Sequence, residues 1–146
     1  MPRPAPGRRA DYAWFTRLDL RFNDNDVYGH LNNAVHYQLF DTAVAEWQAG
    51  AGFATGAGTP WLDLVVESGC RYIGEAAYPD KVDAGLRLGR LGNSSWSYEI
   101  GLFRNSDDSA FAEGFFAMVL TDFESHRPCP LPDEIRALFE RLRPGS

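Results

Sequence analysis

The sequence has few cysteines, little basic charge and no long apolar run, and each shortage excludes a class of protein. Its two cysteines, Cys70 and Cys129, lack the spacing of a metal-binding or redox motif, so we expect reduced thiols and a cytoplasmic location. The formal net charge of −6 argues against a nucleic acid partner and against binding to anionic membranes. Without an apolar run of membrane-spanning length, we expect no membrane partner.

The length and composition favour one packed domain. A chain of 146 residues is long enough for a single hydrophobic core, and an aromatic content of 14% is typical of a globular fold. The first residues are rich in Pro and Arg and include no apolar signal-peptide core. We therefore predict a disordered lead-in over residues 1–12 and a single domain over residues 13–146.

Hydrophobic periodicity predicts an α+β fold. Apolar residues alternate with charged ones from Thr16 to Phe22, which indicates a strand with one buried face. A long helix with apolar residues around most of its circumference is predicted from Asn33 to Gln48, ending at Gly50. Short turns separate the later strands and favour antiparallel neighbours. The remaining predicted elements are strands over Leu62–Ile73, Lys81–Leu91, Ser94–Phe103 and Ala110–Asp122, and a short terminal helix over Asp133–Leu142.

The segment between the first strand and the long helix, residues 21–37, carries most of the functional information. It crosses a turn that contains Asp24, Asp26 and Gly29 and then enters the helix. A helix N-terminus offers unpaired N–H groups and a partial positive charge, which polarise a carbonyl group while a nearby carboxylate acts as base or nucleophile. The pattern therefore indicates a site for acyl transfer.

Simpler interpretations compete for the same residues. Asp26 and Gly29 are common turn formers in any protein. An EF-hand calcium loop is excluded because Val35 stands where the bidentate Glu is required. His30 and His36 lack a third clustered ligand, so we predict no zinc site.

This segment resembles the signature of the 4-hydroxybenzoyl-CoA thioesterase-like branch of the hotdog-fold proteins. The predicted order β-α-β-β-β-β is also that of the hotdog fold, in which a five-stranded curved antiparallel sheet wraps a long central helix. Asp41 stands where the family commonly has Glu. The residues that carry the resemblance are Arg21, Phe22, Asp24, Asp26, Gly29, His30, Leu31, Asn32, Asn33, Tyr37 and Phe40.

The resemblance implies a role for individual residues. Asp26 takes the position of the catalytic carboxylate, and backbone N–H groups around Asn32 and Asn33 are expected to hold the thioester oxygen. No metal or redox cofactor is implied, since coenzyme A enters only as part of the substrate. The other residues expected at the substrate are Gly29, His30, Tyr37, Ser94 and Ser95, with Trp47, Phe53, Trp61 and Tyr72 as aromatic candidates for the acyl pocket.

We therefore expect an acyl-CoA thioesterase that forms a homodimer or homotetramer and in which Asp26 acts as general base or nucleophile. Two other classes stay open. One is a hotdog acyl-CoA dehydratase or hydratase, for which His30 or His36 would supply the base. The other is a non-catalytic acyl-CoA binding module. Thioesters of coenzyme A and of acyl carrier protein both fit the pattern, with any acyl group.

Overall fold

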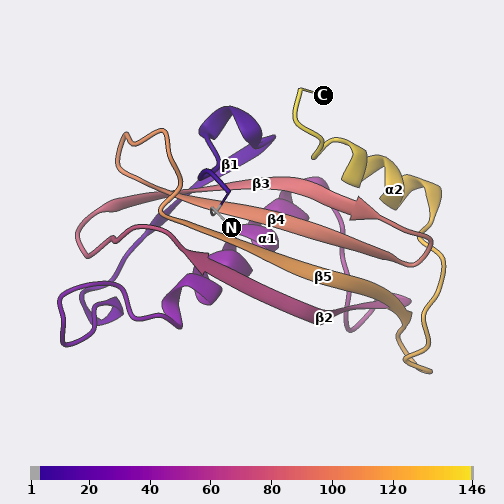
Figure 1. Cartoon of the computed structure of the whole chain (residues 1–146). Coiled ribbons are helices and arrows are strands. Elements are labelled where there is room, and N and C mark those ends of the chain that lie inside the picture. Colours follow the sequence, from indigo (N-terminus) through magenta and orange to yellow (C-terminus); the bar gives the residue numbers. More distant parts are fainter. Residues whose placement is uncertain (1–3, 146) are drawn as a thin grey trace.

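The alternating segments of the chain form one five-stranded antiparallel sheet in the order β1-β3-β4-β5-β2. The computed structural model describes residues 4–145, and Figure 1 shows the sheet lying across the long helix α1. The edges of the sheet are β1 and β2, which each pair with only one neighbour. The strands are β1 (Trp14–Asp19), β2 (Trp61–Tyr72), β3 (Lys81–Leu91), β4 (Ser95–Arg104) and β5 (Ala112–Asp122).

The helix α1 (Val35–Ala51) packs its apolar side against one face of this sheet. At Gly114 of β5 an added Cβ would overlap the ring of Phe40, so glycine lets the helix approach the sheet closely. Together, sheet and helix confirm the α+β hotdog architecture that the sequence predicts. The buried residues of the helix are Val35, His36, Leu39, Phe40, Ala43, Val44 and Trp47.

Among the predicted boundaries that differ from the structure, two are explained by a local backbone feature. The helix continues through Gly50 to Ala51 and ends at Gly52, whose φ of 78° is the left-handed conformation common at helix C-termini. The first strand ends at Asp19 and does not reach Phe22, because residues 22–24 form a short 3₁₀ helix.

The C-terminal helix α2 (Asp133–Glu140) covers one end of the sheet. Its buried Phe139 stacks on Trp96 of β4, with ring centroids 4.7 Å apart, and on Trp47 of α1 at 5.8 Å. Figure 1 shows that the loop before α1 lies at the opposite end of the sheet. The two ends therefore differ in structure, since one is closed by aromatic packing and the other carries the loop with Asp26 and Gly29.

Residues 4–12 differ from the predicted disordered lead-in, of which residues 1–3 lie outside the described part of the chain. Arg8 forms an isolated bridge with Ser109, and residues Arg9–Asp11 form a short 3₁₀ helix. Tyr12 is buried over Gly85 and Gly101, where an added Cβ would lie within 3.0 Å of its ring. The segment is thus held by packing on the sheet face turned away from α1. No helix among residues 4–145 is long and apolar enough to cross a membrane.

Candidate active site

The loop before α1 folds into a tight turn around Asp26. The Asp26 N–H donates to the carbonyl oxygen of His30 at 2.7 Å, and the Gly29 N–H donates to the carbonyl oxygen of Asp26 at 3.1 Å. Gly29 has a φ of 83°, which a residue with a side chain adopts only at a cost. The glycine is therefore needed for the turn, which fixes the position of Asp26.

The Asp26 carboxylate is half-buried and is oriented by the same turn. Its Oδ1 accepts a hydrogen bond from the Tyr28 N–H at 2.9 Å and a longer one from the His30 N–H at 3.4 Å. Its Oδ2 has no hydrogen-bond partner among residues 4–145. One carboxylate oxygen is thus held by the backbone, and the other is available to a ligand or a water molecule.

The neighbouring Asp24 has a structural role. Its buried carboxylate accepts the Arg21 backbone N–H at 2.7 Å and pairs with the Arg21 guanidinium at 3.0 Å. The Asp24 carbonyl oxygen accepts the Asn32 N–H at 2.8 Å. Asp24 therefore ties the turn to the start of the helix.

The backbone N–H groups just before α1 differ in whether they have a partner. The Asn32 side chain accepts the Ala34 N–H at 2.9 Å, and the Asn32 carbonyl accepts the Val35 N–H at 2.9 Å. The N–H of Asn33 has no acceptor among residues 4–145. Of the two residues whose N–H groups the resemblance implies at the thioester oxygen, Asn32 donates to the Asp24 carbonyl, and Asn33 keeps a donor without a partner among residues 4–145.

Asp26 and Asn33 open into the same cavity, which has a volume of about 400 Å³. The segment after β2 closes one side of it, and the Leu31 N–H donates to the Ala76 carbonyl oxygen at 2.9 Å. At the opening, Nε2 of His30 lies 3.2 Å from a carboxylate oxygen of Glu75, and both side chains are exposed. The cavity is lined by Asp26, Tyr28, His30, Leu31, Asn33, His36, Tyr72, Gly74, Glu75 and Ala76.

Several residues expected at the substrate do not line this cavity. Tyr37 packs edge-on against Phe40, with ring centroids 5.8 Å apart, and does not line the cavity. Ser94 precedes β4 and Ser95 is its first residue, so both lie next to the β3–β4 turn at the α2 end of the sheet. A ten-residue strand is about 30 Å long, so these serines are remote from Asp26 within the chain.

The aromatic candidates for the acyl pocket also lie in different parts of the structure. Tyr72 lines the cavity, whereas Trp47 and Phe53 pack with Phe139 in the core. Glu75 is a cavity residue that the sequence reasoning missed, because a Glu in a turn after a strand has no distinctive pattern.

Comparison with known proteins identifies the family. The sequence matches the Thioesterase-like superfamily over residues 20–139. The chain belongs to this superfamily. It is 38% identical to the PA5185 protein from Pseudomonas aeruginosa strain PAO1, whose solved structure superposes with a TM-score of 0.90 over 98% of this chain and 99% of that one. A search of curated proteins found no match.

Further solved structures share the fold of this thioesterase-like chain. The PA2801 protein from Pseudomonas aeruginosa is 30% identical, with a TM-score of 0.79 over 86% of this chain and 97% of that one. Slr0204, a 1,4-dihydroxy-2-naphthoyl-CoA thioesterase from Synechocystis, is 12% identical, with a TM-score of 0.78 over 86% of this chain and 93% of that one. At this low identity, the Synechocystis structure shows similarity of fold only.

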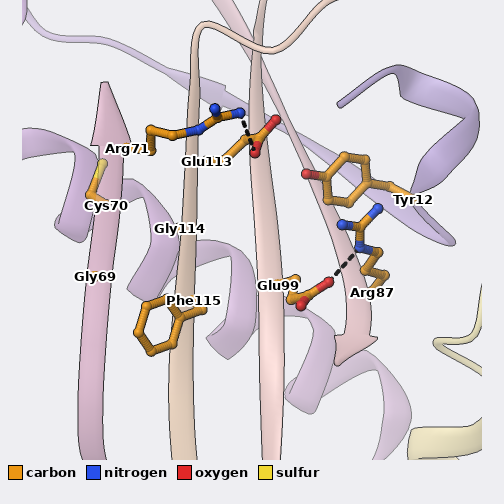
Figure 2. Close-up of a pocket in the computed structure, with 9 residues that line it drawn as sticks. All are labelled: Tyr12, Gly69, Cys70, Arg71, Arg87, Glu99, Glu113, Gly114 and Phe115. Atoms are coloured by element: carbon orange, nitrogen blue, oxygen red, sulfur yellow. Dashed lines mark hydrogen bonds and ion pairs between the residues drawn. The ribbon is translucent and has the colours of Figure 1, made fainter. Parts of the chain in front are cut away.

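The thioesterase-like chain has a second cavity, of about 440 Å³, on the sheet face turned away from α1. Figure 2 shows that its charged side chains are paired: Arg71 with Glu113 at 3.1 Å and Arg87 with Glu99 at 2.7 Å. Burial raises the pKa of Tyr12 to about 12, so its phenol stays protonated at neutral pH. Both carboxylates of this cavity are paired with arginines, and its lining includes no helix start, so the candidate active site is the one at Asp26.

Proposed function

We propose that this protein hydrolyses acyl thioesters of coenzyme A and that Asp26 is its catalytic carboxylate. The observation that carries the proposal is the cavity that Asp26 and Asn33 both line, since Oδ2 of Asp26 and the N–H of Asn33 have no hydrogen-bond partner among residues 4–145. Thioester hydrolysis needs a group that activates or delivers the nucleophile and a donor for the carbonyl oxygen. Membership of the superfamily supports this choice.

In the proposed reaction, the Asn33 N–H donates to the thioester carbonyl oxygen and stabilises the negative charge that develops there. The partial positive charge at the start of α1 adds to this stabilisation. Asp26 acts in one of two ways. It removes a proton from a water molecule that attacks the carbonyl carbon, or it attacks this carbon itself and forms an anhydride that water then hydrolyses. Both routes break the carbon–sulfur bond and release the acid and free coenzyme A.

The pair of His30 and Glu75 supports a second candidate function. A hydratase needs a base and a proton donor near the acyl α and β carbons, and a His beside a carboxylate is suited to that task. The 3.2 Å separation of these two side chains at the cavity opening provides such a pair. Their exposure makes this candidate weaker, because water competes for both groups.

The deciding experiment measures free thiol release from a panel of acyl-CoA esters by the wild type and by Asp26→Asn. Asn keeps an oxygen that accepts the Tyr28 and His30 N–H groups, so the turn should survive while the charge is lost. We expect the rate to fall by about 10²–10⁴-fold, as for the loss of a general base. The matched control is Asp19→Asn. The Asp19 side chain is 85% exposed at the end of β1, so this variant should hydrolyse the esters at the wild-type rate.

Each alternative gives a different result in this experiment. Loss of enoyl-CoA absorbance without thiol release identifies a hydratase. Binding of acyl-CoA by the wild type and Asp26→Asn alike, with no turnover by either, identifies a binding module. Equal thiol release by the two proteins, with melting and assembly unchanged, removes Asp26 from the mechanism.

A further inference from the structure

The cavity of about 440 Å³ on the sheet face turned away from α1 has a regular construction. Strand pairing aligns its residues in two rows that run across four strands. Positions two apart on a strand share a face, so both rows face the same side of the sheet. From β3 through β4 and β5 to β2, the first row is Arg87, Glu99, Phe115 and Gly69, and the second row is Gly85, Gly101, Glu113 and Arg71.

Glycines in these rows make room for two aromatic rings. An added Cβ at Gly69 would lie 2.6 Å from the ring of Phe115, and one at Gly101 would lie 2.6 Å from the ring of Tyr12. Each ring therefore lies close against the backbone of a neighbouring strand. Figure 2 shows Tyr12 and Phe115 on opposite sides of the cavity, which has one aromatic wall at each side.

Tyr12 brings an unpartnered hydroxyl group to the cavity. The residue is only 7% exposed, yet it lines the cavity, and its hydroxyl makes no hydrogen bond with any residue from 4 to 145. The Arg87 guanidinium over its ring, at 4.7 Å, and the edge of Phe103, at 5.7 Å, fix its orientation. Because the phenol stays protonated at neutral pH, the hydroxyl is a hydrogen-bond donor in a fixed position.

The ion pair of Arg87 and Glu99 leaves one donor and one acceptor unused. Arg87 donates from Nε to Oε1 of Glu99 at 2.7 Å and from Nη1 to the Asp11 carbonyl oxygen at 3.1 Å. Its Nη2 and the Oε2 of Glu99 have no hydrogen-bond partner among residues 4–145. The two arginines and two glutamates of the lining have no net charge together. A ligand with charge of one sign is repelled by half of them, so the cavity favours a ligand that carries both signs.

We propose that this cavity binds an α-amino acid with an apolar side chain. The carboxylate accepts hydrogen bonds from Nη2 of Arg87 and from the Tyr12 hydroxyl, and the ammonium group donates to Oε2 of Glu99. Both charged groups of an α-amino acid are attached to the same carbon, which suits two side chains that are themselves paired. The apolar side chain packs on Phe115, which stands opposite Glu99 in the sheet. The inference is independent of the proposed thioesterase activity, because the two cavities share no residue.

The test measures binding of L-phenylalanine to the wild type by calorimetry. Two analogues, 3-phenylpropanoate and phenethylamine, each lack one of its charged groups. We expect each analogue to bind about tenfold more weakly than L-phenylalanine, as the loss of one hydrogen bond to a charged group allows. Tyr12→Phe removes only the hydroxyl and keeps the ring over Gly85 and Gly101. Glu99→Gln keeps an oxygen for Arg87 and removes the negative charge.

The two variants have different expected effects. Tyr12→Phe should weaken L-phenylalanine and 3-phenylpropanoate about tenfold and leave phenethylamine unchanged, because it removes a donor to the carboxylate. Glu99→Gln should weaken L-phenylalanine and phenethylamine and leave 3-phenylpropanoate unchanged or tighter. The matched controls are Tyr78→Phe and Glu67→Gln, at exposed residues outside the lining, and both should bind all three compounds as the wild type does.

Several outcomes overturn the proposal. No binding of L-phenylalanine at millimolar concentration overturns it, as does binding that Tyr12→Phe and Glu99→Gln leave unchanged. Equal binding of the three compounds to the wild type shows apolar contact only and also overturns it. This comparison decides the ligand class even if a variant fails to fold, which melting curves reveal. If both variants dissociate an oligomer in sedimentation and L-phenylalanine does not bind, a second copy covers the cavity and no amino acid site exists.

Discussion

The Tyr72 hydroxyl donates a hydrogen bond of 2.8 Å to the carbonyl oxygen of Asn33, across 39 positions of sequence. This bond joins the end of the edge strand β2 to the start of α1. The same peptide group is held at its other end, because the Ala34 N–H donates to the Asn32 side chain. Both ends of the peptide are therefore fixed, and with them the direction of the adjacent Asn33 N–H that we place at the thioester oxygen.

Removing this hydroxyl should reduce catalysis while leaving binding nearly intact. In Tyr72→Phe the ring still packs against His36, but the Asn33 peptide loses its partner. We expect kcat to fall about threefold to tenfold, as one neutral hydrogen bond allows, with KM little changed. Since burial raises the pKa of Tyr72 to about 12, the phenol does not titrate near neutral pH, and the two proteins should share one pH profile there. Steady-state rates between pH 6 and 8 check this, and an unchanged kcat would contradict it.

Replacing Asp24 should act on stability rather than directly on chemistry. Asp24→Asn loses a charged acceptor that is buried against the Arg21 N–H and guanidinium. We expect the free energy of unfolding to fall by about 1–3 kcal/mol, measured by urea denaturation. Thiol release at a temperature where the variant is folded should decline far less than in Asp26→Asn. A rate loss as large as that of Asp26→Asn would place Asp24 in the reaction.

From the exposed edge of strand β2 we predict that the protein self-associates. Leu64, Val65 and Val66 are exposed on this strand, whose outer backbone groups have no neighbour in the sheet. Edges of this kind pair with another chain unless they are blocked. Sedimentation should therefore show a dimer or tetramer, and Val66→Lys should weaken it while the circular dichroism spectrum stays the same. A stable monomer of 16.3 kDa at micromolar concentration would contradict this expectation.

His36 should make the fold sensitive to acid. Its pKa is lowered by burial in the folded state, so the unfolded chain binds more protons as the pH falls through its ordinary value near 6.5. This part of the stability is fully present above pH 6.5 and decreases below it, until the folded pKa is reached. His36→Phe should lose less stability than the wild type between pH 7.5 and pH 5. Denaturation curves at both pH values measure the difference, and parallel losses would show that other groups determine the acid sensitivity.

The sequence by itself determined the elements and the local turn. Alternation of apolar residues placed the strands within a few positions, since side-chain direction in a strand depends only on the backbone. The turn that holds Asp26 also follows from near neighbours, because Gly29 supplies the positive φ and the Tyr28 and His30 N–H groups bond the carboxylate. Local hydrogen bonds and one backbone conformation are enough for this part of the site.

Only the tertiary structure decided what surrounds Asp26. Tyr72 and Glu75 reach the cavity because β2 ends beside the helix start, and that contact depends on strand pairing across the whole sheet. The same pairing sends Ser94 and Ser95 to the opposite end, although their sequence context resembles a substrate contact. The choice of Asn33 over Asn32 as the free donor depends on the Asp24 carbonyl, whose position is known only once the loop has closed. Contacts between distant segments have no period in the sequence, and they therefore become visible only in the folded chain.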